Sequence, residues 1–435
     1  MKSFALLFLC IWAGASYGAI ESAVDLQHRI EERLAALFAE KDLRLSDHAV
    51  LLASRYRKLL IEPMAEDARR GALERLLARC DAPAPRGDVQ EDLARVAAPA
   101  LVDGGSRASL KAALAWALSA ARKDKRERLP FGRRTVKRTD LVASIALFAE
   151  LVERTPDPAE LMKVLAASFD VYRSPGLAPS HDVLFTAYHD PVFEGRLTPD
   201  ATFRWPAYAP PSRAGLANER YSRADVARGA LAGKGLELVY LGDPLDAFLL
   251  EVEGSGLVHL PDGRCVKLEF AAKNGKPYAS LGKAMVRLGY LKPWEMSVPA
   301  IRQYLRREPS KLRATLDLNP CQVYFRATML PEVPRTLEYI AERSVACDQT
   351  YFPKAGIGFA LLERPVPGPD GGPARWVPHA RFIVNHDTGA AVRGPGHIDL
   401  YWGHARDSGE VAGLMREPGE LYYFLKKGTP LSQRR

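Results

Sequence analysis

The sequence has few cysteines, and none of them stand at the spacing of a metal or redox motif. Five cysteines occur in 435 residues, without a single C-x-x-C pair. This argues against zinc-ribbon and thioredoxin-like chemistry. Beyond the N-terminal segment lie Cys80, Cys265, Cys321 and Cys347. In an oxidising compartment they would form one or two disulfides, and otherwise they would be buried free thiols. The sequence leaves both alternatives open.

Long apolar runs are also scarce. The N-terminus reads MKSFALLFLCIWAGASYGA, in which a lysine precedes an apolar stretch over residues 4–13 that is short for a bilayer span. Small residues follow where a signal peptidase cuts. We interpret residues 1–18 as a cleaved export signal, with a short membrane anchor as the alternative. Cys10 follows Leu9 instead of a small residue, so we do not expect lipidation. The mature protein is expected in the periplasm or cell envelope.

The basic residues gather in one segment that has almost no aromatic residues. Residues 122–138, RKDKRERLPFGRRTVKR, hold nine Lys or Arg and two Asp or Glu, in a chain whose net charge is +9. Phe131 is the one aromatic residue among them, which argues against a stacking platform for single strands. No nucleic-acid partner is expected. The segment is either a solvated loop between helices or a surface for an anionic polymer or a protein partner.

Regular alternation of strands and helices is absent, which disfavours a doubly wound parallel sheet. Up to about residue 170, apolar residues recur at helical spacing. From about residue 181 the apolar runs become short and β-rich: VLFTAY, LELVYL, AFLLEVEG, LVHL, VKLEF, QVYFRA, FIVNH and HIDLYW. Asp262-Gly263 marks a hairpin turn. Helices are expected at SLGKAMVRLG and, capped by Ser297, at SVPAIRQYLRRE. The pattern predicts a mainly β fold with a helical N-terminal part.

Two aspartates accompany strand-like runs near the C-terminus. In HIDLYWG, a period of two places Ile398 and Leu400 on the apolar face, and Asp399 and Tyr401 on the face toward a groove or solvent. Asp387 opens the sequence Asp-Thr-Gly, which is good turn chemistry. Asp399 gains nothing from a turn, so it is the stronger candidate for chemistry. A carboxylic acid in a groove can protonate a glycosidic oxygen.

Two other chemistries have little support. An aspartic protease places two Asp-[Ser/Thr]-Gly motifs together, and the chain has one, so it would need a homodimer. His386, His397 and His404 are spaced too widely for a compact metal site. We therefore expect neither a metal nor another cofactor.

Six segments, taken together and in order, resemble the MltA-type membrane-bound lytic murein transglycosylases. They are VLFTAYHDP, FLLEVEGSGLVHLPDG, FAAKNGKPYASLGKAM, NPCQVYFR, RSVACDQTYFPKAGIGF and HDTGAAVRGPGHIDLYWG. The order holds from about residue 110 to 428. The resemblance implies a double-psi β-barrel, a second β-domain inserted into it, and a groove between them. The expected division is signal 1–18, helical extension 19–105, helical lead-in and first barrel part 106–192, inserted β-domain 193–322, and second barrel part or 3D module 323–430.

The resemblance also implies a function and a site. The function is a peptidoglycan lytic transglycosylase, which cleaves the bond between N-acetylmuramic acid and N-acetylglucosamine and forms a 1,6-anhydro ring without a cofactor. Asp399 would be the catalytic acid and then the base. Asp387 would orient it or bind sugar, and Asp348 would support the site. The candidate sugar-binding residues are Thr186, Tyr188, Gly254, Ser255, Gly256, Asn274, Gly275 and Tyr401.

Several positions depart from the family pattern. His189 and Asp190 replace a Tyr-Glu pair, Glu253 stands where glutamine is usual, and His386 replaces a glutamine. These departures leave a non-catalytic glycan-binding protein on the same frame as the alternative. A hydrolase is a third hypothesis, with Asp387 or Glu253 activating water.

Overall fold

The protein is described from a computed structural model. The described residues are 22–39, 43–82, 92–99, 102–177, 180–334, 338–369, 372–389, 391–404 and 408–434. The expected export signal, residues 1–18, lies outside them. Within these ranges no helix combines the length and the apolar character that a membrane crossing requires.

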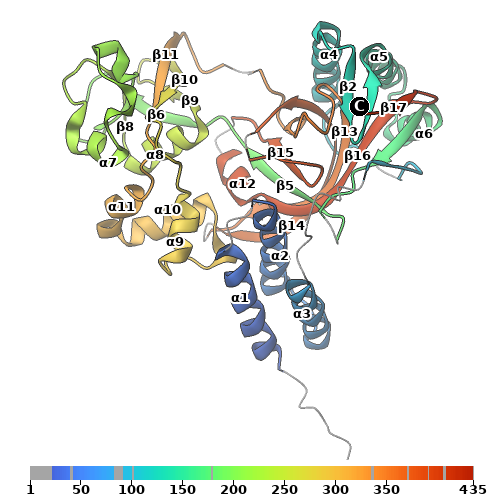
Figure 1. The fold of residues 1–435 in the computed structure, drawn as a ribbon, viewed down its shortest axis with the longest axis horizontal. Coiled ribbons are helices and arrows are strands. Elements are labelled where there is room, and N and C mark those ends of the chain that lie inside the picture. The colour runs from blue at the N-terminus through green and yellow to red at the C-terminus, as the bar shows by residue number, and fades with distance from the viewer. Residues whose placement is uncertain are drawn as a thin grey trace, which may run out of the picture.

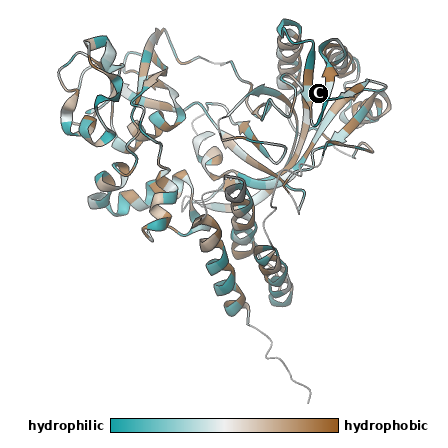
Figure 2. Cartoon of the chain, in the orientation of Figure 1, coloured by the Kyte–Doolittle hydropathy of each residue, from teal (hydrophilic) through white to brown (hydrophobic). Residues whose placement is uncertain are grey.

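Three N-terminal helices form an arm beneath the two β-domains (Figure 1). They are α1 (Ala23–Ala39), α2 (Leu43–Ile61) and α3 (Glu66–Asp81). Apolar and polar residues share the surface of each helix (Figure 2), and the apolar ones meet in a common core. Trp294, from the short helix η4 (Pro293–Glu295) of the inserted domain, packs into this core edge-to-face against Tyr56, with ring centroids 5.1 Å apart. The arm is thereby attached to the inserted domain.

The larger β-domain is a closed barrel. Its six strands, in order around the barrel, are β16 (Arg416–Lys426), β13 (Ile357–Pro367), β14 (Pro373–Asp387), β12 (Ser344–Ala346), β15 (His397–Tyr401) and β5 (Val183–Tyr188), and β5 pairs with β16 to close the ring. The strands β4 (Phe169–Arg173) and β1 (Ala94–Val96) extend the sheet beyond β16. The fold class expected from the sequence, mainly β with a helical N-terminal part, is confirmed.

The lead-in helices cover one side of the barrel. They are α4 (Arg107–Lys123), α5 (Arg138–Arg154) and α6 (Pro158–Ser168). Phe148 on α5 contacts the rings of Phe382 and Phe424 on the barrel strands, at centroid distances of 5.1 and 5.7 Å. Such rings bury large apolar areas. The apolar faces of these helices therefore share one hydrophobic core with the barrel.

The basic segment lies between α4 and α5, as one of the two alternatives expected, but it forms a β-hairpin and not a loop. It contains a hairpin of β2 (Arg128–Phe131) and β3 (Arg134–Lys137), to which β17 (Leu431–Gln433) adds a third strand. Gly132 makes the turn with φ +67°. Part of the positive charge is neutralised within the chain, because Arg126 pairs with Asp124 at 2.6 Å and Arg134 pairs with Asp92 at 2.8 Å.

The inserted domain holds a six-stranded sheet and several short helices. The strands, in order across the sheet, are β11 (Val323–Leu330), β10 (Cys265–Lys273), β9 (Ser255–His259), β6 (Val192–Arg196), β8 (Glu237–Leu241) and β7 (Trp205–Tyr208). The helices are η1 (Pro211–Ala214), η2 (Asn218–Arg220), α7 (Arg223–Asp225), η3 (Val226–Ala230), α8 (Pro244–Glu253), α9 (Leu281–Arg287), α10 (Val298–Arg307) and α11 (Pro309–Leu316). The barrel adds α12 (Ser408–Leu414) on the facing side.

Several local expectations for this domain agree with the structure, and one does not. The turn at Asp262-Gly263 joins β9 to β10, and Ser297 caps α10 by accepting from the amide of Ala300. The run AFLLEVEG, expected as a strand, is part of helix α8. Asp243 caps that helix and Gly254 ends it in a left-handed conformation with φ +76°. These start and stop signals outweigh the β-propensity of the run.

The domain boundary expected after residue 322 is too early, because it separates β11 from the inserted sheet to which that strand belongs. Strand β11 pairs with β10 along its whole length, so the inserted sheet continues to Leu330. At the other end Val192 already lies in β6 of that sheet. The four described cysteines, Cys80, Cys265, Cys321 and Cys347, are buried free thiols, which decides between the two alternatives for them.

Candidate active site

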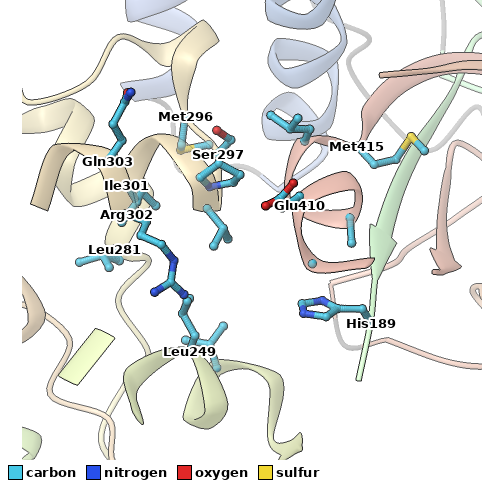
Figure 3. A pocket seen from close by; sticks show the side chains of 18 of the residues that line it. His189, Leu249, Leu281, Met296, Ser297, Ile301, Arg302, Gln303, Glu410 and Met415 are labelled. Carbon is cyan, nitrogen blue, oxygen red and sulfur yellow. The ribbon is translucent and has the colours of Figure 1, made fainter. Parts of the chain in front are cut away.

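A cleft of about 1090 Å³ separates the barrel from the inserted domain. Figure 3 shows that Arg302 of α10 and Glu410 of α12 lie on opposite sides of this space. The barrel side also contributes Thr186 and His189, and the insert side contributes Glu253 and Tyr278. The cleft therefore has the expected location, between the two β-domains.

Asp399 lies in the middle of β15, next to this cleft. Strand β15 runs parallel to β5, and the register places Asp399 directly opposite Thr186. The Thr186 hydroxyl, whose residue lines the cleft, donates a hydrogen bond of 2.7 Å to Oδ1 of Asp399. Nε2 of His397 lies 2.9 Å from the same hydroxyl oxygen. The pairing of β5 with β15 therefore keeps Asp399 and His397 both in contact with the Thr186 hydroxyl.

The surroundings of Asp399 favour its protonated form. Burial raises the pKa of Asp399, and the negative charge of Asp387 adds to the rise. The Thr186 hydrogen bond and the charge of His397 act in the opposite direction, yet the net pKa stays above the usual range. A raised pKa keeps a carboxyl group protonated to a higher pH, which a general acid requires.

Asp387 ends β14 and orients a tyrosine. Its Oδ1 accepts from the amide of Thr388 at 2.7 Å, which is the turn that the Asp-Thr-Gly sequence predicts. Its Oδ2 accepts from the Tyr188 hydroxyl at 3.2 Å. Tyr339 packs edge-on to Tyr188 and to Tyr401, with centroid distances of 6.1 and 5.5 Å. Asp387 therefore positions an aromatic cluster beside the acid.

Asp348 braces the loop that leads into β15. Its Oδ1 accepts from the amide and the hydroxyl of Thr350, at 2.9 and 2.7 Å, and its Oδ2 accepts from the amide of Gly394 at 2.7 Å. Burial alone would raise the pKa of Asp348, but these hydrogen bonds outweigh it and hold the pKa below the usual range. An ionised carboxylate with three donors is suited to fixing a loop and not to donating a proton.

Tyr401 does not face the groove, contrary to the expectation from the period of two. Its side chain is 1% exposed, and its hydroxyl donates to Oδ2 of Asp190 at 2.7 Å. The rings of Tyr188 and Tyr339 pack against Tyr401, with centroid distances of 5.2 and 5.5 Å, and cover it, although Asp399 on the same face of β15 remains beside the cleft. The contact holds Asp190, one of the departures from the family pattern, against the barrel.

The remaining sugar-binding candidates are less well placed. Asn274 is buried, and its amide donates to the carbonyls of Tyr221 and Pro320, both at 2.9 Å, while its oxygen accepts from the Gln322 amide at 3.0 Å. It fixes a loop of the insert. Gly275 continues that loop with φ +69°.

Gly254, Ser255 and Gly256 form the junction between α8 and β9. A Cβ at Gly256 would lie 2.7 Å from a methyl group of Leu250 and 3.4 Å from Pro191. Close packing accounts for this glycine without a sugar. Of the candidates named from the sequence, the structure brings Asp399, Thr186, Asp387 and Tyr188 together.

Glu253 is a more prominent part of the site than the sequence indicated. It is the last residue of α8 and is exposed to the cleft, but both walls surround its carboxyl group. Loss of solvation there, helped by the charges of Asp399 and Asp190, raises the pKa of Glu253 to about 7. Its departure from the usual glutamine was the signal available in the sequence.

His397 and Tyr339 were not recognised from the sequence as parts of the site. His397 stands two residues before Asp399 and so lies on the same face of β15, a signal that the period of two contains. Tyr339 carries no such signal, because it lies outside any strand. The described residues contain no cluster of three or more His, Cys, Asp or Glu side chains arranged to hold a metal ion.

Two family models match this chain. Residues 184–326 match the MltA specific insert domain, and residues 343–425 match the 3D domain. Membrane-bound lytic murein transglycosylase A of Vibrio cholerae is 33% identical over 291 residues, which are 65% of this chain and 75% of the relative. The protein of that name from Escherichia coli K12 is 31% identical over 258 residues, 58% of this chain and 68% of the relative.

Solved structures show the same fold. The membrane-bound lytic murein transglycosylase of Agrobacterium tumefaciens superposes with a TM-score of 0.58 at 25% identity, over 78% of this chain and 98% of that one. E. coli MltA with bound chitohexaose gives a TM-score of 0.59 at 24% identity, over 78% and 96%. The resemblance that the six sequence segments indicated is confirmed, and the chain belongs to the family of membrane-bound lytic murein transglycosylase A.

Proposed function

We propose that this protein cleaves peptidoglycan between N-acetylmuramic acid and N-acetylglucosamine, with Asp399 as the single acid and base. The observation that carries the assignment is the position of Asp399, a mid-strand carboxyl group beside the interdomain cleft with a raised pKa. One related structure holds chitohexaose, a chain of β-linked N-acetylglucosamine units. The cleft here is large enough for several sugar rings.

The mechanism uses the same carboxyl group twice. Protonated Asp399 donates its proton to the oxygen that links the two sugars, and the bond from that oxygen to C1 of the muramic acid breaks. The Asp399 carboxylate then accepts the proton of the muramic acid C6 hydroxyl, whose oxygen bonds to C1. The product is a 1,6-anhydro ring, and Asp399 regains its proton, so the cycle closes without water.

Other residues of the site have supporting roles in this proposal. Thr186 holds the Asp399 carboxyl group through Oδ1, which leaves Oδ2 free to face the sugar. Tyr188, oriented by Asp387, offers an aromatic face to a sugar ring. Asp348 keeps the loop before β15 in place. We further propose that the protein is exported and works in the cell envelope, and that the basic residues of 122–138 contact an anionic surface or a partner there.

Mass spectrometry of digested peptidoglycan tests the proposal. Purified sacculi are incubated with the wild-type protein, with Asp399→Asn and with Asp262→Asn, which changes an exposed turn carboxylate that does not line the cleft. The proposal expects anhydromuropeptides from the wild type and Asp262→Asn, and none from Asp399→Asn. Reducing-end products would instead identify a hydrolase. Binding to sacculi without cleavage would favour the glycan-binding alternative.

A further inference from the structure

The carboxylate of Asp47, in the N-terminal arm, contacts β15, the strand that carries Asp399. Oδ2 of Asp47, on α2, lies 3.3 Å from Nδ1 of His397, the first residue of β15. The side chains are 21% and 9% exposed, so the pair is shielded from bulk water. Asp47 lies outside both segments that match the family models. The arm therefore supplies a charged group to the site that the shared domains do not contain.

The contact continues without a break to the acid. Nε2 of His397 lies 2.9 Å from the Thr186 hydroxyl oxygen, and that hydroxyl lies 2.7 Å from Oδ1 of Asp399. Asp47, His397, Thr186 and Asp399 thus form a line of three short contacts, which we call the Asp47–Asp399 line. The Asp47–His397 contact is an ion pair, whereas the two contacts of Thr186, at 2.9 and 2.7 Å, lie within hydrogen-bond distance, so proton transfer is confined to the part of the line between His397 and Asp399.

Counting hydrogens along this line permits two arrangements. When Asp399 is ionised, Thr186 donates its one hydrogen to Asp399 and must accept from Nε2–H of His397. Nδ1 of His397 faces a carboxylate and so also carries hydrogen, which makes the ring an imidazolium. When Asp399 is protonated, it donates to Thr186, Thr186 donates to Nε2, and His397 is neutral with its hydrogen on Nδ1. Both arrangements contain the same number of protons.

We propose that Asp47 is a positioning residue for the acid and base, and that it acts through His397 and Thr186. In either arrangement the negative charge of Asp47, 3.3 Å away, favours a hydrogen on Nδ1, so Nε2 is the nitrogen that gives or takes a proton. The transfer moves the Nε2 proton to Thr186 and the Thr186 proton to Asp399, and the reverse transfer restores the first state. No oxidant or other reactant is needed. The inference rests on the proposed role of Asp399.

The other charged groups around the Asp47–Asp399 line make different contacts and do not face Nδ1 of His397. On β14, Asp387 raises the pKa of Asp399 from the far end, and on α8 the charge of Asp399 acts on Glu253. On β16, Arg416 stands opposite Thr186 in register but donates to the carbonyl of Trp294 at 2.7 Å.

Two further groups lie nearby on these elements. The next residue on β16, Glu417, is paired with Arg57 of α2 at 2.6 Å. On α2 itself, burial lowers the pKa of His48, so this neighbour of Asp47 is neutral at pH 7. Among the described residues, Asp47 is therefore the carboxylate that faces Nδ1 of His397.

The pH dependence of cleavage distinguishes an electrostatic role of Asp47 from a purely structural one, which would leave the pH profile unshifted. Burial tends to lower the pKa of His397, but the contact with Asp47 outweighs it and raises the pKa. Asp47→Asn removes the charge and keeps the shape. The protonated state of the His397–Asp399 pair then becomes less favourable, so the alkaline limb of the kcat profile should move to lower pH by about one unit. Asp67→Asn, on α3 with a 92% exposed side chain, is the matched control and should not move it.

Nuclear magnetic resonance of ¹⁵N-labelled imidazoles reads the same contact without activity. His397 should remain protonated at Nδ1 across its titration in the wild type, and its pKa should fall in Asp47→Asn and recover in Asp47→Glu. Overlaid kcat profiles and unchanged His397 titrations in wild type and Asp47→Asn would overturn the inference. If Asp47→Asn fails to fold, a wild-type His397 that is neutral with its hydrogen on Nε2 overturns it equally. If the wild type releases no anhydro products, the proposed function fails, while the imidazole titration still decides the contact.

Discussion

Thr186 and Asp399 lie opposite each other on two parallel strands, and the hydroxyl of the one donates to the carboxyl group of the other at 2.7 Å. The two residues are 213 positions apart in the chain. A hydroxyl is the smallest side chain that can both donate to an ionised acid and accept from a protonated one. The pair therefore suits an acid that changes its protonation state within each cycle.

Replacing Thr186 by valine should slow cleavage and shift its acidic limb. The Thr186 hydrogen bond favours the ionised form of Asp399, so its loss raises the pKa of Asp399 further. Asp399 must be ionised to act as the base, so the acidic limb of the pH–rate profile should move to higher pH. We expect the rate at neutral pH to fall about tenfold to a hundredfold, measured as anhydromuropeptide formation over time. Thr186→Ser keeps a hydroxyl and should retain most of the activity; equal losses in both variants would contradict the role of the hydrogen bond.

Replacing Glu253 by glutamine should change the rate only where the carboxyl group is charged. The pKa of Glu253 is raised to about 7, so the group is protonated at pH 5 and ionised at pH 8. When ionised, its charge opposes ionisation of Asp399 and helps to keep the acid protonated. At pH 5, Glu253→Gln should therefore have the same rate as the wild type. The alkaline limb of its pH–rate profile should lie at a lower pH than that of the wild type. A rate lost at every pH would show instead that Glu253 activates water or binds substrate directly.

Breaking the Arg57–Glu417 pair should destabilise the protein strongly. The two side chains are 5% and 2% exposed and 2.6 Å apart, and Ser54 of the same helix donates to Glu417 at 2.8 Å. Arg57→Met leaves a buried carboxylate without its cationic partner, which costs about 3 kcal/mol of the free energy of unfolding. Urea titration followed by circular dichroism measures it. Lys111→Ala, which removes an exposed pair with Glu153, is the control and should leave the curve unchanged.

The four described cysteines should react with thiol reagents only after unfolding. All four are buried, and burial raises the pKa of each thiol, to about 12 for Cys80. Thiolate is the reactive form, so the native protein at pH 8 should be nearly inert to a disulfide dye. In denaturant without reductant, all four should titrate. Fewer than four would reveal a disulfide that the structure does not contain.

The sequence by itself determined the class of protein. Short β-rich runs identified seven strands, which are β5, β8, β9, β10, β11, β14 and β15. Asp262-Gly263 identified the β9–β10 hairpin, and Ser297 identified the start of α10, because each of these signals acts between near neighbours in the chain. Six ordered motifs indicated a peptidoglycan lytic transglycosylase, and membership of the family confirms that enzyme class. The mid-strand position of Asp399 singled it out before any contact was known.

Only the tertiary structure decided which side chains meet. Packing of Tyr188 and Tyr339 buried Tyr401, although its place in the strand pattern suggested a groove. The cap at Asp243 and the glycine that ends the helix made α8 from a run that reads as a strand. Asp47 meets His397 because α2 packs on the barrel, and no local pattern records that contact. Propensity and periodicity act over a few residues, whereas the line from Asp47 to Asp399 depends on packing between segments that are distant in the chain.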